Sequence, residues 1–447
     1  MLPYNLGLEG YVGYVLYATM WVAFLVSVFR QPSAGIYYLA LLLPIQTIRY
    51  RLNAYPLGAS MVSIIMIGVI IGALRQERPE PRPARNSFLY IYLAFTFISL
   101  CAGSIYLGDS VLPDFHHPRF QTWRDYVSMA LLLPVTTAAI TNRRQMQTLL
   151  LVMCFSGFLL DKSFWGTVSG RDFSSYSDDL RDNGAMGYAG VNGLAAFEAQ
   201  FAMAVLSLAA FEEKFWMKAM YYALALFSAV CLMYSLSRAG YAAFVVGWLY
   251  LGIVKERKLL ALLVAFGLTW TTLVPNAVRD RVSMTNSSGS LDHSSETRVN
   301  LWDDAIQLFN QNPVVGTGFN TYAYMSRIGN YKDTHNIYIK VLVETGAVGI
   351  VLFLLLLFSL WLKGFGLFLR SSNPVSASIG LALSCWIVCA AVANFFGDRW
   401  TFLQVNGYMW MIAGMVNRAT ALEDADEDEE QDEAVDTDDA ELAPVAV

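Results

Sequence analysis

Long apolar runs recur from one end of this 447-residue chain to the other, and they constrain its fold more than any other feature. Many of the runs approach or exceed about 18 residues, the length that an α-helix needs to cross the hydrocarbon core of a membrane. Apolar residues make up 56% of the sequence and charged residues only 15%, too few for a soluble protein of this size to cover its surface. We therefore predict an all-α, polytopic bundle of transmembrane helices.

The apolar runs divide the chain into about 12–14 predicted spans. Thirteen can be drawn, at residues 10–29, 35–48, 57–74, 88–107, 126–140, 146–165, 191–211, 217–235, 240–254, 259–274, 346–362, 375–396 and 401–416. The domain organisation that follows has transmembrane helices in 1–274 and 346–418. Between them, residues 275–345 are predicted to form one large loop outside the membrane with short amphipathic helices.

The last segment, 419–447, is strongly acidic. Thirteen of the 36 acidic residues lie between Glu423 and Glu441, so the rest of the chain has 23 acids against 30 Lys+Arg, a net charge of +7 instead of −6. Because this segment has no apolar period and its like charges repel, we expect it to be disordered. A solvated tail without function and a docking tail, for example for a chain-length regulator, both stay open.

Basic residues in short loops indicate the orientation in the membrane. When the six Lys and Arg of 275–340 are set aside, 15 basic residues fall on one side of the predicted membrane and 9 on the other. The richer side is predicted to be cytoplasmic. This orientation makes the acidic tail cytoplasmic and puts the 275–345 loop on the outer face, which is periplasmic in a cell with two membranes.

Arg238 is the first candidate functional residue. It lies between two apolar runs, at their predicted outer end, with the small neighbours Ser237, Ala239 and Gly240. A charge at the hydrocarbon boundary is costly unless it is paired or reaches the interface. Arg238 is therefore interpreted as a clamp for an anionic ligand, with an arginine that reaches lipid phosphate as the alternative.

Arg298 and Trp302 are the next candidates, one turn apart on a predicted amphipathic helix that ends near Asn310. A guanidinium group suits phosphate oxygens, and an indole ring can stack on a sugar. An exposed surface arginine is the alternative. Arg279 and Arg281 offer further positive charge in the same loop, either for the ligand or for lipid headgroups.

His335 is the candidate base. Asp333 or Thr334 suits a helix cap, which predicts that His335 lies in the first turn of the helix that follows. A helix N-terminus disfavours the imidazolium form, so His335 is suited to take a proton from a sugar hydroxyl. A purely structural, hydrogen-bonding histidine is the alternative.

Other kinds of chemistry have little support in the sequence. It contains no P-loop, no dinucleotide fingerprint, no Gly-x-Ser-x-Gly elbow and no zinc-ligand spacing. We therefore expect no metal site, no cofactor and no nucleic-acid partner.

Five short motifs follow one another in a recognisable order. They are Ser-Arg-x-Gly at 237–240, Arg-x-x-x-Trp at 298–302, Asn-Pro-x-x-Gly-x-Gly-x-Asn-x-Tyr at 312–322, Thr-His-Asn-x-Tyr at 334–338 and Glu-x-Gly at 344–346. This order resembles the O-antigen ligase and polymerase superfamily of bacterial membrane glycosyltransferases, most strongly over 238–349. The segment 191–195 also looks like that family's Asn-x-x-Ala element.

The resemblance implies an enzyme of the bacterial inner membrane that takes a glycan from an undecaprenyl-diphosphate carrier and transfers it to an acceptor hydroxyl, without metal or nucleotide. It further implies that Arg238 and Arg298 bind the diphosphate and that His335 is the acceptor-side catalytic residue. The substrate-binding candidates are Arg279, Arg281, Trp302, Tyr338 and Glu344. The expected partners are the carrier-linked oligosaccharide, an acceptor glycan and membrane lipids.

We expect a one-step, inverting displacement that polymerises repeat units of O-antigen or exopolysaccharide. A ligase that uses lipid A core or a protein as acceptor stays open, because ligases and polymerases share these motifs. A polysaccharide flippase or transporter is a more distant alternative, since the two halves of the sequence show no repeat and the polar residues are concentrated in one loop.

Overall fold

The computed structural model describes residues 11–76, 81–84, 86–110, 114–284, 293–329 and 331–441, and these ranges contain helices and loops without a strand. The all-α prediction is therefore confirmed. Eight helices are long and apolar enough to cross a membrane. They contain α1 (Val12–Phe29), α4 (Met61–Arg75), α5 (Ser87–Tyr106), α8 (Arg143–Val168), α9 (Gly190–Phe211), α10 (Phe215–Tyr234), α15 (Ile337–Arg370) and α16 (Pro374–Phe395), and the spans of α4 and α9 also include the 3₁₀ turns that precede them, from Gly58 and Gly184.

The remaining helices are shorter, bent or more polar. α12 (Lys258–Leu273) and α13 (Asn276–Ser283) form a pair bent by 109°, which makes a ninth candidate span. The others are α2 (Ser33–Leu42), α3 (Gln46–Arg49), α6 (Pro118–Ala130), α7 (Leu132–Ala139), α11 (Arg238–Val254), α14 (His293–Gln311) and α17 (Leu403–Glu441). Five 3₁₀ turns lie at Tyr50–Ala54, Gly58–Ser60, Asp178–Leu180, Gly184–Ala189 and Tyr322–Tyr324.

The candidate spans in the described residues, eight or nine, are fewer than the thirteen drawn from the sequence. Each predicted span does contain a helix. Four of the others correspond to α2, the α6–α7 pair, α11 and the first part of α17, and the fifth is α12, which counts as a candidate span only together with α13. These helices are short, broken or interrupted by polar residues, features that a hydropathy pattern averages out.

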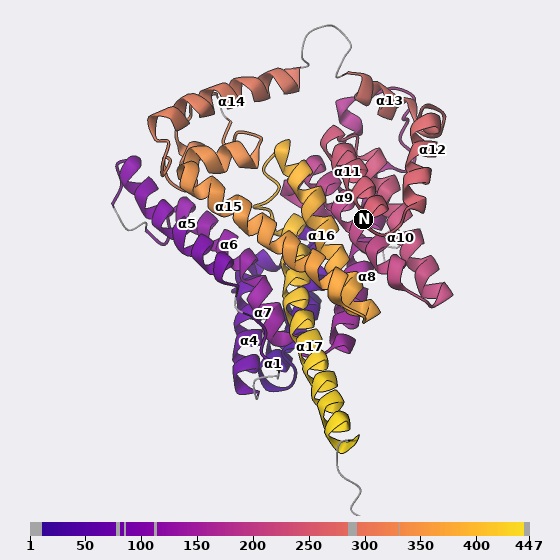
Figure 1. Ribbon diagram of the computed structural model, residues 1–447. Helices are drawn as coiled ribbons and strands as arrows, with labels where there is room; N and C mark the ends of the chain where they lie inside the picture. Colours follow the sequence, from indigo (N-terminus) through magenta and orange to yellow (C-terminus); the bar gives the residue numbers. More distant parts are fainter. Residues whose placement is uncertain are drawn as a thin grey trace, which may run out of the picture.

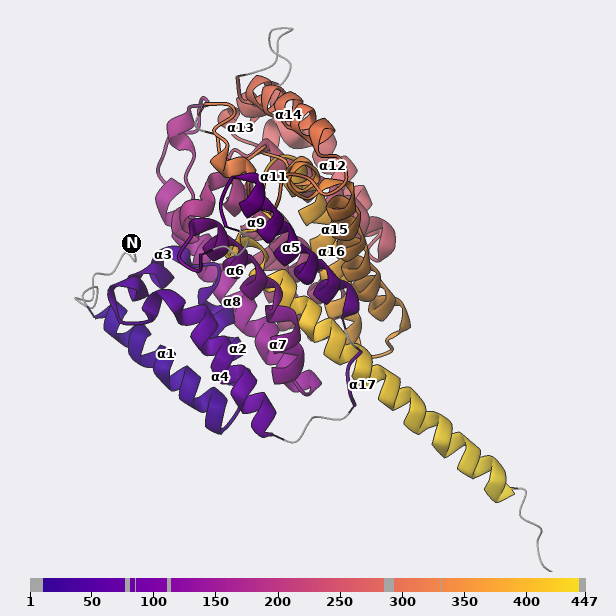
Figure 2. The same ribbon diagram turned by 90° about the vertical axis from the view of Figure 1, so that its left-hand side faces the viewer.

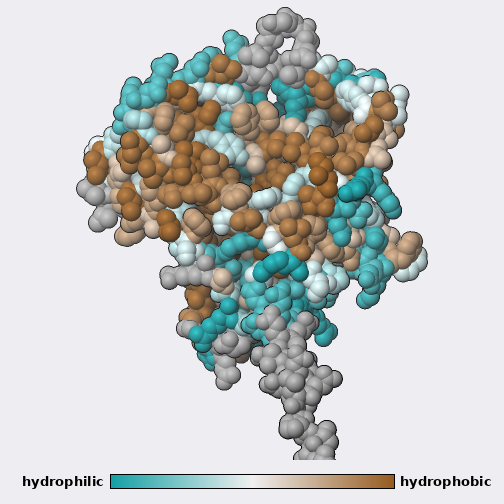
Figure 3. Space-filling view, viewed as in Figure 1, coloured by the Kyte–Doolittle hydropathy of each residue, from teal (hydrophilic) through white to brown (hydrophobic). Residues whose placement is uncertain are grey.

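The outer surface of the bundle carries a continuous apolar band. In Figure 3 this band lies between a polar upper end and a polar lower end. Large apolar side chains are fully presented to the outside, for example Leu74 at 75% exposure and Leu268 at 80%. A soluble protein would not expose such a surface, whereas a lipid-facing bundle must.

The centre of the bundle is formed by α9 and α16, which pack on each other and on α11, while α10 flanks α9 and α15 flanks α16. Small residues allow close helix packing there. A β-carbon on Gly364 of α15 would lie only 2.8 Å from the carbonyl oxygen of Gly380 on α16. Helices α1, α2 and α4 pack together on one side of the bundle (Figure 2), where α2 also contacts α8 and α4 contacts α7.

The two ends of the molecule differ in what they carry. α13 and α14 cover one end, and α17 extends from the opposite end (Figure 1). The acidic segment differs from the prediction of disorder, because it continues α17 to Glu441. Ion pairs fix its first acidic turn: Arg143 Nη2 lies 2.9 Å from Glu423 Oε1, and Arg370 Nη1 lies 3.3 Å from Asp424 Oδ1.

Candidate active site

A break in α15 anchors the loop that holds most of the candidate residues. At Gly346 the backbone has φ 67° and ψ −170°, and a β-carbon there would lie 2.2 Å from the carbonyl oxygen of Val314. The amide of Ala347 donates to Pro313 O at 2.9 Å, and that of Val348 donates to Val314 O at 3.2 Å. The turn at 312–320 is therefore docked directly on a membrane helix.

Glu344 completes this anchor. Its carboxylate is 3% exposed and accepts the amide of Asn320 at 2.9 Å and the amide of Tyr322 at 3.3 Å. Its carbonyl oxygen accepts the amide of Gly318 at 2.6 Å. The Glu-x-Gly and Gly-x-Gly-x-Asn motifs thus meet in space, and the contacts of Glu344 fix the backbone of the turn.

The prediction that His335 lies in the first turn of a helix capped by Asp333 or Thr334 is wrong. α15 begins at Ile337, and its N-cap is Asn336, whose Oδ1 accepts the amide of Tyr338 at 2.9 Å. His335 precedes the cap with a φ of 51°, the left-handed region that side chains other than glycine rarely adopt. The imidazole therefore projects from the loop instead of the helix.

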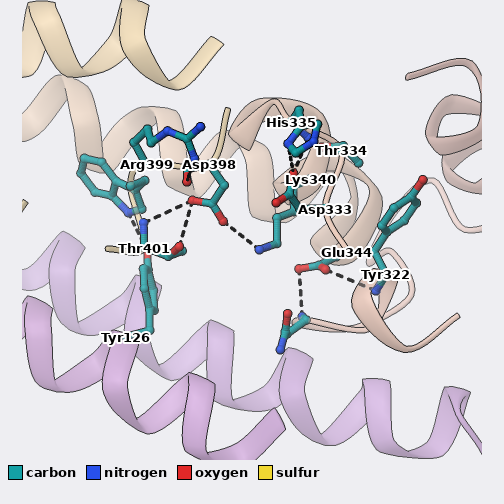
Figure 4. Close-up of polar contacts among 12 residues, drawn as sticks. Tyr126, Tyr322, Asp333, Thr334, His335, Lys340, Glu344, Asp398, Arg399 and Thr401 are labelled. Atoms are coloured by element: carbon teal, nitrogen blue, oxygen red, sulfur yellow. Dashed lines mark hydrogen bonds and ion pairs between the residues drawn. The ribbon is translucent and has the colours of Figure 1, made fainter. Parts of the chain in front are cut away.

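Asp333 holds His335 by two hydrogen bonds. Its Oδ1 accepts the His335 amide at 2.6 Å and lies 2.7 Å from Nδ1 of the imidazole (Figure 4). Burial raises the pKa of Asp333, but the hydrogen bonds and charge of His335, with the charge of Lys340, outweigh burial and hold this pKa below its ordinary value. With its proton on Nδ1 and donated to Asp333, His335 presents Nε2 as the proton acceptor.

Trp302 fastens α14 to the histidine loop. Its Nε1 donates to Thr334 O at 2.9 Å, and its ring meets Phe395 edge-on at 5.8 Å. The indole is thus in contact with the segment next to His335. Arg298 lies one turn earlier on α14 and is half-buried.

Arginines from four separate segments gather at the same end, and we call Arg181, Arg238, Arg281 and Arg399 the arginine group. The charges of Arg181 and Arg238 act on Arg281, and those of Arg181, Asp333 and Asp398 act on Arg399. Burial lowers the pKa of Arg399, and the two aspartates counteract this effect. The group is therefore a concentration of positive charge that reaches the Asp333–His335 pair.

Polar contacts tie the arginine group to the helices. Asn192 on α9 accepts two hydrogen bonds at Oδ1, from Arg181 Nη2 at 2.9 Å and from Ser237 Oγ at 2.9 Å. Ser237 is the N-cap residue of α11, which begins at Arg238. The Asn-x-x-Ala and Ser-Arg-x-Gly segments are thus joined at the site. Arg281 lies over the ring of Tyr176, 4.8 Å from its centroid.

An ion pair between Lys340 and Asp398 lies next to these residues. Lys340 Nζ, on the second turn of α15, donates to Asp398 Oδ2 at 2.8 Å, and the other oxygen of Asp398 accepts the Thr401 hydroxyl at 2.9 Å. Figure 4 shows Lys340 between the Asp333–His335 pair and Glu344. Among the described residues, no group of three or more His, Cys, Asp or Glu is arranged to hold a metal ion.

Two of the other candidates make contacts away from the histidine. Tyr338 donates its hydroxyl to Ala391 O at 2.8 Å, which joins α15 to α16. Arg279 contacts the side chain of Asn276, within its own helix.

Sequence reasoning missed five residues that the structure brings to this site: Asp333 as the partner of His335, Arg181, Arg399, Lys340 and Asp398. The local Asp-x-His spacing was the one signal for Asp333. The others come from the 169–189 loop, from α15 and from the turn between α16 and α17.

The fold and these contacts define an integral membrane helix bundle with a histidine–aspartate pair near a group of arginines. A family model described as O-antigen ligase matches residues 223–354, so this segment is similar to that family, and the resemblance drawn from the motifs is confirmed there. The matched segment includes Arg238, Arg281, Arg298 and His335, whereas Arg181 and Arg399 lie outside it. None of the curated proteins matches the chain.

Proposed function

We propose that this protein transfers a glycan from an undecaprenyl-diphosphate-linked donor to a sugar hydroxyl at the outer face of the membrane, and that it thereby polymerises repeat units. The observation that carries the proposal is the placement of a candidate base near a group of arginines: Asp333 Oδ1 lies 2.7 Å from His335 Nδ1, and the charge of Asp333 acts on Arg399 of the arginine group. Glycosyl transfer from a diphosphate requires both elements.

In the proposed mechanism, Arg238 and Arg298 bind the donor diphosphate, supported by Arg281 and Arg181. The acceptor hydroxyl attacks the anomeric carbon of the donor sugar from the face opposite the diphosphate. His335 Nε2 takes the hydroxyl proton as the new C–O bond forms, and the bond from the anomeric carbon to the diphosphate oxygen breaks. The arginines stabilise the negative charge that develops on this leaving group, and the configuration at the anomeric carbon inverts.

Asp333 is a positioning residue in this scheme. Its carboxylate fixes the imidazole orientation through Nδ1 and stabilises the imidazolium that forms when Nε2 accepts the proton. Trp302 and Glu344 are also positioning residues in this scheme. Trp302 donates a hydrogen bond to the backbone of Thr334, and Glu344 accepts hydrogen bonds from the backbone of Asn320 and Tyr322.

The test is in vitro transfer by purified protein with carrier-linked oligosaccharide, in the presence and absence of lipid A core, read as a gel ladder. His335→Ala and Arg298→Ala should abolish the product. His116→Ala and Arg75→Ala are matched controls, because both side chains are exposed and Arg75 lies on a different part of the bundle.

A ladder of repeat units formed without lipid A core supports the polymerase. A single shift of lipid A core assigns a ligase instead. Carrier lipid that crosses the bilayer without any glycan transfer would overturn the enzyme proposal in favour of transport.

A further inference from the structure

A cavity of about 270 Å³ is lined by Lys340 and Glu344, and the proposed mechanism leaves it without a role. It is enclosed by the first turns of α15, by α6, by the docked turn at Phe319 and Asn320, and by the turn that contains Trp400 and Phe402. Lys340 lines the cavity, and Figure 4 shows this residue between the Asp333–His335 pair and Glu344.

Three polar groups in the cavity wall have hydrogen-bonding capacity to spare. Asn320 is 7% exposed, and its side-chain amide has no hydrogen-bond partner among the described residues. Lys340 uses one of its three donors, for Asp398, and each oxygen of Glu344 accepts a single amide. An amide, a donor and an acceptor therefore converge on one enclosed space, where an unpaired polar group is costly.

Aromatic rings form much of the remaining wall, among them Phe319, Trp400 and Phe402, together with the aliphatic Ile337 and Val341. Tyr188, which is 61% exposed, lies where the cavity opens to the outside. Flat apolar rings facing a few convergent polar groups suit a pyranose, which has one C–H face and a rim of hydroxyls. The volume has room for one such ring.

We infer that this cavity is the subsite for a neutral pyranose at the end of the acceptor glycan. This inference rests on the proposed function and deepens it, since it assigns the acceptor to the α15 side of His335 and the donor diphosphate to the arginine group. A sugar held here has its hydroxyls on the side of Lys340, toward the base.

The charges in the wall specify a neutral sugar. Lys340 is the cation of the described lining, and Asp398 neutralises it at 2.8 Å. Asp125 adds a carboxylate at the edge of the cavity. A uronic acid would thus bring its own carboxylate into an enclosed space that offers it no uncompensated cation.

Binding can be measured without turnover, by saturation-transfer NMR of purified protein with methyl glucoside and methyl glucuronide as probes. The informative variant is Asn320→Gly, because the backbone of Asn320 has a φ of 54°, which glycine adopts without strain. The matched control is Asn310→Ala on the exposed face of α14. Size-exclusion profiles and Tm establish that both variants fold.

The wild type and Asn310→Ala should bind the glucoside and discriminate against the glucuronide. In Asn320→Gly, glucoside binding should weaken about tenfold, which corresponds to the loss of one buried hydrogen-bonding group. Equal binding of the two probes, no binding of the glucoside, or unchanged binding in Asn320→Gly would overturn the inference.

The cavity and the proposed function can fail separately. If the glucoside binds in an Asn320-dependent manner but no variant forms a glycan product, the cavity stands as a sugar site and the transferase proposal fails. If the ladder forms and Asn320→Gly leaves the KM for acceptor unchanged, the transferase stands and the cavity is not its acceptor subsite.

Discussion

His335 occupies a backbone conformation that costs free energy, and its neighbour Asp333 compensates for that cost. The left-handed φ of 51° is held by the hydrogen bond from the His335 amide to Asp333, and the same carboxylate orients the imidazole. One side chain thus fixes both the main chain and the ring of the candidate base.

Asp333→Asn separates orientation from charge, because asparagine can still accept the His335 amide but no longer stabilises an imidazolium. We expect kcat for transfer to fall by about a hundredfold or more, with little change in the KM for donor. The measurement is the initial rate of ladder formation over a range of pH. Asp303→Asn, on the exposed face of α14, is the control. A variant with the wild-type kcat would remove Asp333 from the mechanism.

The same carboxylate makes fold stability depend on pH. The pKa of Asp333 is held below its ordinary value of 3.8, so its interactions stabilise the fold fully above pH 3.8, and this contribution is lost as the pH falls further. We expect the difference in Tm between wild type and Asp333→Asn to be largest near neutral pH and to shrink below pH 3.8. A difference that grows on acidification would contradict this linkage.

At the residue scale, the sequence singles out candidate residues only where a motif is local. The sequence picks out Arg238, Arg298 and His335 because each lies in a recognisable short pattern. It gives no indication of Arg399, which reaches the site only because the turn between α16 and α17 lies next to the start of α15, more than 60 residues away. Contacts of that kind depend on helix packing, which no local pattern encodes.

At the scale of elements, the break in α15 is the main device that positions the loop. The backbone of the helix is irregular at Gly346. The amides of Ala347 and Val348 therefore donate hydrogen bonds to carbonyl oxygens of the 312–320 turn. The hydropathy pattern predicts a span at 346–362 and a loop up to residue 345. In the structure, the helix already begins at Ile337. The polar first turns of this helix conceal it, since Lys340 and Glu344 interrupt the apolar run.

Gly346→Ala tests the break. A β-carbon would collide with Val314 O and would also be strained at φ 67°, so we expect a loss of at least about 2 kcal/mol in unfolding free energy, together with lower transfer activity. Gly366→Ala is the matched control on the same helix, because a β-carbon there meets nothing within 4 Å. That control should be neutral or stabilise by about 0.5 kcal/mol. Thermal unfolding in detergent measures both, and equal Tm values would contradict the docking role.

At the scale of the whole molecule, the site and the acidic end of α17 lie at opposite ends of an apolar bundle (Figure 1). The apolar band between them matches the multi-pass architecture predicted from the sequence. The charge bias of the loops further predicts which end faces the cytoplasm.

Single cysteines can test that orientation. Asn310→Cys lies on the exposed face of α14, and Glu427→Cys lies on the exposed part of α17. We expect a membrane-impermeant maleimide to label the first in intact spheroplasts and the second only after permeabilisation. The reverse pattern would invert the orientation and place the proposed chemistry on the cytoplasmic side. The unsubstituted protein gives the background, since four of its five cysteines are buried.

The size of the cavity lined by Lys340 and Glu344 has a consequence for the product. If the cavity of about 270 Å³ is the acceptor subsite inferred above, it holds the terminal sugar and leaves the preceding sugars of the chain outside. Each addition of an identical repeat then regenerates the same terminal sugar, so the enzyme would meet a short and a long chain as equivalent substrates. The pocket therefore does not distinguish polymers by their length. Any preferred length of the finished polysaccharide has to be set by something other than this pocket.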